Sequence, residues 1–83
     1  MRILILNPNT SEEFTQAIHT AGEAVKSPGT EVVTLNPSSG PRSIESAYDE
    51  LLSCGPCLEV LIARQAEFDG FIIACYGNHP VIY

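Results

Sequence analysis

The hydrophobic positions of this 83-residue chain form two kinds of pattern, short continuous runs and stripes with helical spacing. Three runs, at residues 3–6, 31–35 and 70–75, predict β-strands. The first and third are apolar throughout, which suits strands covered on both faces in a parallel sheet. Polar residues interrupt the second run and favour an edge position for it.

Stripes with helical spacing separate the three runs. The first helix is predicted to begin at Thr10, whose hydroxyl can cap it while Glu13 follows three positions on. It is predicted to end at residues 27–29, Ser-Pro-Gly. The second helix begins at Ser43 and is predicted to break at Gly55-Pro56, because proline lacks an N–H group and clashes with the preceding turn. The βαβαβ order implies a parallel sheet with right-handed crossovers.

The last residues begin one more helical pattern. Asn78 is a typical helix cap, Pro80 suits a first turn, and residues 81–83 open an apolar stripe. A natural domain rarely ends on a helix that has just begun. Residues 1–83 are therefore expected to be the N-terminal part of a longer domain, here truncated.

Charge and hydropathy exclude several classes of partner. Ten acidic and four scattered basic residues give a formal net charge of -6, which argues against nucleic acid, since that ligand requires clustered cations. No run approaches the roughly 20 apolar residues of a membrane span, and the opening run is too short for a signal peptide. A cytoplasmic protein with reduced thiols is expected, and an odd number of cysteines, three, argues against a disulfide framework.

The candidate chemistry lies at the carboxyl ends of the predicted strands, where ligands bind in open parallel sheets. Three polar segments reach that edge, at residues 7–11, 36–43 and 75–78. Among them only Cys75 is a plausible nucleophile or base. By position alone, a cysteine that ends an apolar strand is more often a core residue, so this pattern leaves both roles open.

Five segments, in the right order and over nearly the whole chain, resemble the aspartate/glutamate/hydantoin racemase family. They are residues 2–11, 28–32, 40–45, 48–50 and 68–78. Within the family the resemblance is to hydantoin and allantoin racemases and not to the glutamate racemases of cell-wall synthesis. It implies that the three-stranded parallel sheet has the order 2-1-3, with flanking helices, and is the first part of a flavodoxin-like racemase lobe.

The resemblance also implies an activity. Racemases of this family need no cofactor and no metal, and two cysteines exchange the α-proton of a small amino-acid derivative, such as a hydantoin, on opposite faces. Cys75 matches the first cysteine, and the second has no match within these 83 residues. The chain alone is therefore expected to be inactive. A homo-oligomer is compatible with the full-length protein.

The chemistry of this reaction points to partners for Cys75, because the developing enolate must be stabilised by fixed donors. Backbone N–H groups near Tyr76, Gly77 and Asn78, with the amide of Asn7, are expected to bind substrate and stabilise a developing oxyanion. The helix start after Asn78 would favour a thiolate. Many family members read Asp-Pro after the cysteine, whereas here His79 precedes the proline. An exposed or capping His79 is expected.

Two other functions stay open. Cys54-Gly55-Pro56-Cys57 matches the thioredoxin tetrapeptide, although that motif needs a strand just before it and a helix that starts at the first cysteine. If the helix starts at the ligand edge near Ser43, a rise of about 1.5 Å per residue puts Cys54 roughly 16 Å below that edge. Neither a second base nor a zinc site with Cys57, Cys75 and His79 is then expected. A non-catalytic remnant of a truncated gene is the other alternative.

Overall fold

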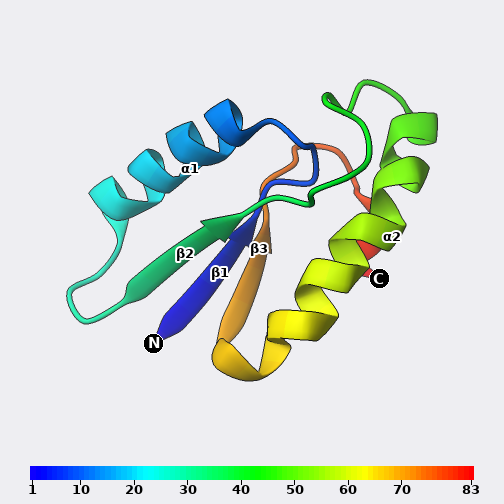
Figure 1. Ribbon diagram of the computed structural model, residues 1–83. Coiled ribbons are helices and arrows are strands. Elements are labelled where there is room, and N and C mark those ends of the chain that lie inside the picture. Colours follow the sequence, from blue (N-terminus) through cyan, green and yellow to red (C-terminus); the bar gives the residue numbers. More distant parts are fainter.

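A computed structural model describes residues 1–83 and contains three strands, two α-helices and two 3-10 turns (Figure 1). In chain order these are β1 (Arg2–Leu6), α1 (Glu12–Val25), β2 (Glu31–Leu35), α2 (Ala47–Arg64), η1 (Gln65–Glu67), β3 (Gly70–Ile73) and η2 (Pro80–Ile82). The three strands form one parallel sheet of order β2-β1-β3. The predicted order and the edge position of the second strand are confirmed. No helix has both the length and the apolar character that a membrane crossing needs.

Helix α1 covers one face of the sheet at very short range. The glycine at position 22 permits this approach, because a Cβ atom there would lie 3.0 Å from Ile5 Cδ1 and 3.4 Å from Val32 Cγ1. On the same face, His19 Nδ1 lies 2.9 Å from Thr34 Oγ1. A larger residue at position 22 would have to push the helix away from the strands.

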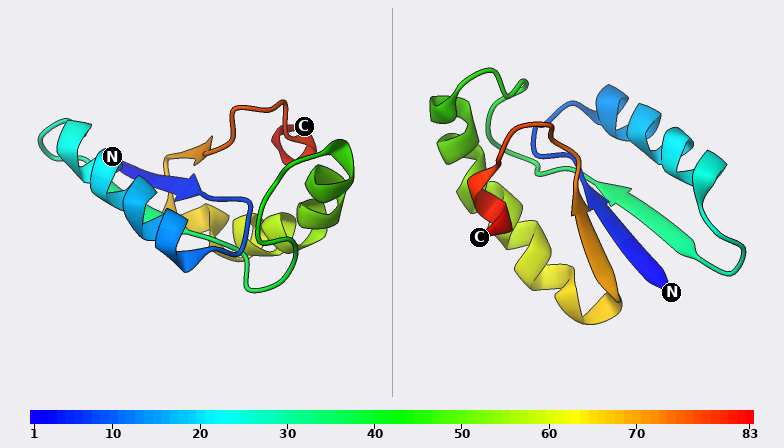
Figure 2. Two further views of the ribbon diagram at one scale, coloured as in Figure 1. Left: turned by 90° about the horizontal axis from the view of Figure 1, so that it is seen from above. Right: turned by 180° about the vertical axis from the view of Figure 1, so that it is seen from behind.

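Helix α2 covers the opposite face. Side chains alternate across a strand, so Leu4 and Leu6 of β1 lie on the other face from Ile5, and both are fully buried. In the register, Phe71 of β3 is level with Leu4 and also lies on the α2 side. The three strand ends and their loops gather at one end of the sheet (Figure 1), and η2 lies beside α2 at that end (Figure 2).

The first helix starts one residue later than predicted. Ser11, and not Thr10, is its cap: Ser11 Oγ accepts a hydrogen bond from the Phe14 N–H group at 3.2 Å. The reason is a hydrogen bond from Ser11 to a residue that precedes it in the chain. Asn9 Oδ1 accepts a hydrogen bond from the Ser11 N–H group at 2.9 Å, and this local turn places Ser11 at the cap position.

The second helix differs from its prediction in two ways. It begins after Ser46 and not at Ser43, since Ser46 Oγ accepts from the Asp49 N–H group at 3.3 Å while Asp49 Oδ2 accepts from the Glu45 N–H group at 3.0 Å. The predicted break at Gly55-Pro56 is wrong, because α2 runs through Pro56 as one helix of 18 residues.

The third strand ends earlier than predicted, at Ile73 instead of Cys75. The Ala74 N–H group still donates to the Leu6 carbonyl at 2.8 Å, but the Cys75 N–H group turns back to Ile73 O at 2.9 Å. Cys75 therefore lies in the loop beyond the sheet. The predicted cap at Asn78 is also wrong, since His79 caps η2.

Candidate functional site

Cys75 lines a hollow of about 430 Å³ at the carboxyl end of β3. Its other walls are Ile18 of α1 and the neighbouring residues Ile73, Ala74 and Tyr76. The Cys75 side chain is half-buried, so its thiol is accessible from the hollow while its backbone is held by the turn after β3. The sequence-predicted reacting group thus lies in a cavity at the expected edge of the sheet.

The loop after Cys75 presents backbone donors that the protein itself does not use. The N–H groups of Tyr76, Gly77 and Asn78 donate to no acceptor in the structure, and all three residues are exposed. A backbone N–H group must find a partner in water, protein or ligand. These three groups are therefore available to an oxygen atom bound beside Cys75.

Asn7 lies at the same end of the sheet, directly after β1, and is almost fully buried. Its side-chain amide group donates to Asn9 Oδ1 at 2.8 Å, to Thr15 Oγ1 at 3.0 Å and to the Ser11 carbonyl at 3.3 Å. The amide thus organises the loop between β1 and α1. Direct contact between Asn7 and a substrate stays a prediction.

A carboxylate that sequence reasoning missed faces the same loop. A Cβ atom at Gly77 would lie 3.7 Å from Glu50 Oε2 and 3.8 Å from Cys75 Sγ, so both groups border the Gly77 backbone. The Glu50 side chain takes part in no hydrogen bond or ion pair of the structure. The signal in the sequence was the segment Tyr48-Asp49-Glu50, which carried resemblance but no assigned role.

The two cysteines of α2 differ in their surroundings. Cys57 is fully buried and its Sγ lies 3.8 Å from the Pro8 carbonyl oxygen, at the carboxyl end of β1. The expectation that Cys54 lies roughly 16 Å below the ligand edge is therefore wrong, because Cys57, three residues further along α2, is still level with that edge. Burial first, and then the charges of Cys54 and Cys75, raise the pKa of Cys57 to about 11, so this thiol stays protonated at neutral pH.

His79 is fully buried, which corrects the expectation of an exposed side chain, while the expected capping role is confirmed. Its Nε2 lies 2.6 Å from Ser53 Oγ of α2, and its Nδ1 accepts from the Val81 N–H group at 3.1 Å. Burial lowers the pKa of His79, and the charge of Glu50 acts in the opposite direction. No three His, Cys, Asp or Glu side chains converge as metal ligands.

Residues 3–83 match the family model described as Asp/Glu/Hydantoin racemase. The chain belongs to that family. The match covers all the strands and helices that position Cys75 and its loop, except the first residue of β1.

Relatives of this racemase-family chain support the same assignment. A hydantoin racemase of Paenarthrobacter aurescens is 38% identical over 80 residues, covering 94% of this chain and 34% of the relative. A hydantoin racemase of Pseudomonas sp. (strain NS671) is 39% identical over 79 residues, covering 94% and 32%. The solved allantoin racemase from Klebsiella pneumoniae superposes with a TM-score of 0.89 at 39% identity, covering 95% and 33%. The chain spans about a third of the length of these proteins.

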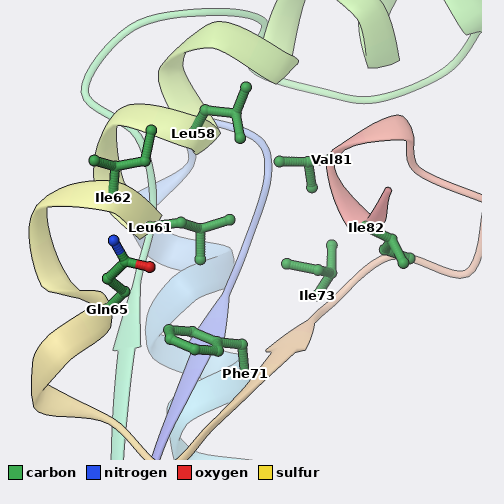
Figure 3. A pocket seen from close by; sticks show the side chains of 8 residues that line it. All are labelled: Leu58, Leu61, Ile62, Gln65, Phe71, Ile73, Val81 and Ile82. Carbon is green, nitrogen blue, oxygen red and sulfur yellow. The ribbon is translucent and has the colours of Figure 1, made fainter.

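A second hollow of this racemase-family fold, about 510 Å³, lies between α2, β3 and η2 (Figure 3). Seven of its eight lining residues are hydrophobic, and Gln65 is the exception. Side chains of the helix, the strand and the 3-10 turn point into it from three sides (Figure 3). It offers no acid, base or nucleophile, so the smaller hollow at Cys75 is the candidate site.

Proposed function

We propose that residues 1–83 form the N-terminal part of a cofactor-independent racemase or epimerase and supply the first of its two acid/base residues, Cys75. The observation that carries this proposal is that the Cys75 thiol lines a hollow at the sheet edge and is followed in the chain by three residues, 76–78, whose N–H groups donate to no acceptor in the protein. Family membership supports the reaction class.

The chemistry needs both parts of this arrangement. The Cys75 thiolate takes the proton from the α-carbon and becomes a thiol, and the electron pair of the broken C–H bond moves onto the adjacent carbonyl oxygen. Donors aimed at that oxygen stabilise the enolate, and loss of one such donor typically costs on the order of 10²–10³ in rate. A second acid on the opposite face then returns a proton to the carbon, which inverts its configuration.

The proposed substrate is a cyclic or ureido derivative of an amino acid, such as a hydantoin. The relatives that resemble this chain include hydantoin racemases and an allantoin racemase, and both of these compounds are small molecules with a carbonyl group beside the reacting carbon. The N–H donors of residues 76–78 suit such a carbonyl. A homo-oligomer of the longer protein stays a prediction.

The experiment is a chimera in which residues 1–83 replace the aligned segment of the Paenarthrobacter aurescens hydantoin racemase. We expect the chimera to racemise a hydantoin and its Cys75→Ser variant to lose turnover, because a serine hydroxyl is far less acidic than a thiol. The variant should still exchange the α-proton of one enantiomer with solvent, through the remaining base. The 83 residues alone should invert nothing.

Cys54→Ser is the matched control, since Cys54 is also a half-buried free thiol but does not line the hollow. It should keep near-normal turnover. Full racemisation by the Cys75→Ser chimera would refute the assignment of Cys75. An inactive chimera that folds would instead support a non-catalytic remnant.

The thiol-disulfide alternative finds less support in the geometry. The tetrapeptide of residues 54–57 lies in the middle of α2, seven residues after its start at Ala47, and no strand precedes it directly. A thioredoxin-like site uses an exposed thiol of lowered pKa at a helix N-terminus.

A further inference from the structure

We propose that His79 is a positioning residue, held as the neutral Nε2–H tautomer, which fastens the Cys75 loop to α2. The inference rests on the proposed function only in treating Cys75 as the reacting group. His79 touches neither the Cys75 hollow nor any of its lining residues by hydrogen bond. It would act through the loop that it anchors.

The hydrogen bonds made by the two ring nitrogens of His79 decide its tautomer. The Val81 N–H group donates to His79 Nδ1 at 3.1 Å, so Nδ1 must carry a lone pair. A neutral imidazole has one N–H group, which must then be at Nε2. The Nε2–H group donates a hydrogen bond to Ser53 Oγ, 2.6 Å away. The Ser53 hydroxyl group in turn donates a hydrogen bond to the Glu50 carbonyl at 2.8 Å. The donor and acceptor of every hydrogen bond from Val81 to the Glu50 carbonyl are therefore assigned.

Charge on the ring is incompatible with this arrangement. A second proton would have to sit on Nδ1, where it would face the Val81 N–H group. The charged group that acts on the ring is Glu50 of α2, and η2 itself has no titratable side chain. Burial outweighs the field of Glu50 and lowers the pKa of His79, in keeping with a neutral ring.

The loop depends on this anchor because it has few others. At one end the Ala74 N–H group donates to the Leu6 carbonyl at 2.8 Å. Between that point and His79, the N–H groups of residues 76–78 have no partner in the protein. Only the exposed hydrogen bond from the Tyr83 hydroxyl to Asn78 Oδ1, at 2.9 Å, adds a further hold. Without the His79 side chain, the far side of the loop would have this one exposed hydrogen bond and the apolar contacts of η2, and no buried hydrogen bond to α2.

The first test is the tautomer itself, read from the imidazole nitrogens of the ¹⁵N-labelled chain by NMR at pH 7. We expect a protonated Nε2 and an unprotonated Nδ1 for His79. Ser53→Ala should shift the Nε2 resonance, because it removes the acceptor. A proton on Nδ1, or a doubly protonated ring at pH 7, would overturn the proposal.

The second test measures the alkylation of individual cysteines by iodoacetamide, resolved by mass spectrometry. Ser53→Ala and His79→Asn both cut the link to α2, since the shorter asparagine keeps only an acceptor near the Nδ1 position. Each should speed alkylation of Cys75 by on the order of tenfold, as expected for loss of one buried hydrogen bond. His79→Gln places an amide N–H near the Nε2 position and should stay within about twofold of the wild-type rate.

Cys57 is the internal control, because it is fully buried one turn beyond Ser53. Its alkylation should stay slow in all variants. Equal acceleration of Cys57 and Cys75 would indicate general unfolding, and it would overturn a positioning role, as would failure of His79→Gln to restore the slow rate. Neither measurement uses substrate, so a failure here leaves the racemase proposal standing, and an inactive chimera leaves the anchor standing.

Discussion

The thiol of Cys57 lies 3.8 Å from the carbonyl oxygen of Pro8, and this contact joins the middle of α2 to the loop after β1. One turn earlier in the helix, Ser53 bonds to His79 in the loop after β3. Pro56 lies between these two contacts. The helix therefore continues through a proline, whose interior position typically costs about 3 kcal/mol, because tertiary contacts hold it on both sides.

Burial of Cys57 predicts a pH dependence of stability. Its folded pKa of about 11 exceeds the ordinary value of 9.0, so above pH 9 the unfolded chain loses a proton that the folded chain keeps. Stability from this group is complete below pH 9 and is lost as the pH rises toward 11. By pH 10 the wild type should lose about 1.4 kcal/mol relative to Cys57→Ala, measured by urea unfolding at pH 7 and 10. The Cys54→Ser variant should show the same loss as the wild type. If the free energies of unfolding of the wild type and Cys57→Ala differ by the same amount at pH 7 and pH 10, the burial argument is contradicted.

The helix caps give a second prediction. Ser11→Ala and Ser46→Ala each remove a side-chain acceptor from a helix N-terminus and should lower the free energy of unfolding by about 1 kcal/mol. Thr10→Ala and Ser43→Ala are matched controls, because the sequence pattern pointed to these two residues and the structure does not use them as caps. Their effect should stay within about 0.5 kcal/mol. Larger losses in the controls than in the caps would reverse the assignment.

The strands were predictable because short, continuous apolar runs such as residues 3–6 and 70–73 are typical of buried strands. The sheet order 2-1-3 came from the resemblance to the racemase family, since the apolar runs alone do not show which strand lies in the centre. The polar interruptions of residues 31–35 likewise marked an edge strand correctly. Helix ends were less predictable. At residues 10–11 and 43–46 two hydroxyl residues compete for one cap, and the choice depends on Asn9 and on Asp49, which bond to the backbone nearby.

The position of Cys75 and its loop at the carboxyl edge of the sheet was predictable, because strand ends and family motifs point to the same place. Glu50, Ser53 and Cys57 could not be placed, since the sequence does not show how far α2 extends beyond the edge of the sheet before it passes the loops. The burial of His79 could not be predicted either. A histidine between asparagine and proline reads as a surface turn, and its burial depends on Ser53, 26 residues earlier.

Asn7 supplies a third prediction. Its buried amide bonds to three acceptors, so Asn7→Ala should destabilise the fold by roughly 1–3 kcal/mol. Asn7→Asp should cost more, because a carboxylate oxygen would then face Asn9 Oδ1 and the Ser11 carbonyl. Thermal and urea unfolding measure both. Asn78→Ala, in an exposed residue, should change stability by less than about 0.5 kcal/mol, and an equal effect at both positions would contradict an organising role for Asn7.

The outer edge of β3 predicts self-association of the 83-residue chain. β3 pairs only with β1, and its free backbone edge is flanked by Phe71 and Ile72, which are 44% and 52% exposed. Such an apolar edge is a template for pairing with another chain, and a lysine on it opposes that pairing. We expect concentration-dependent sedimentation for the wild type and a monomer for Ile72→Lys.

The control is Val25→Lys, which introduces the same charge away from the edge, at a residue that is 83% exposed at the end of α1. Both substitutions reduce the net charge from -6 to -5, which by itself favours association. A monomer formed by Ile72→Lys and not by Val25→Lys would therefore identify the β3 edge as the interface, whereas a monomeric wild type would show that this edge is protected in solution.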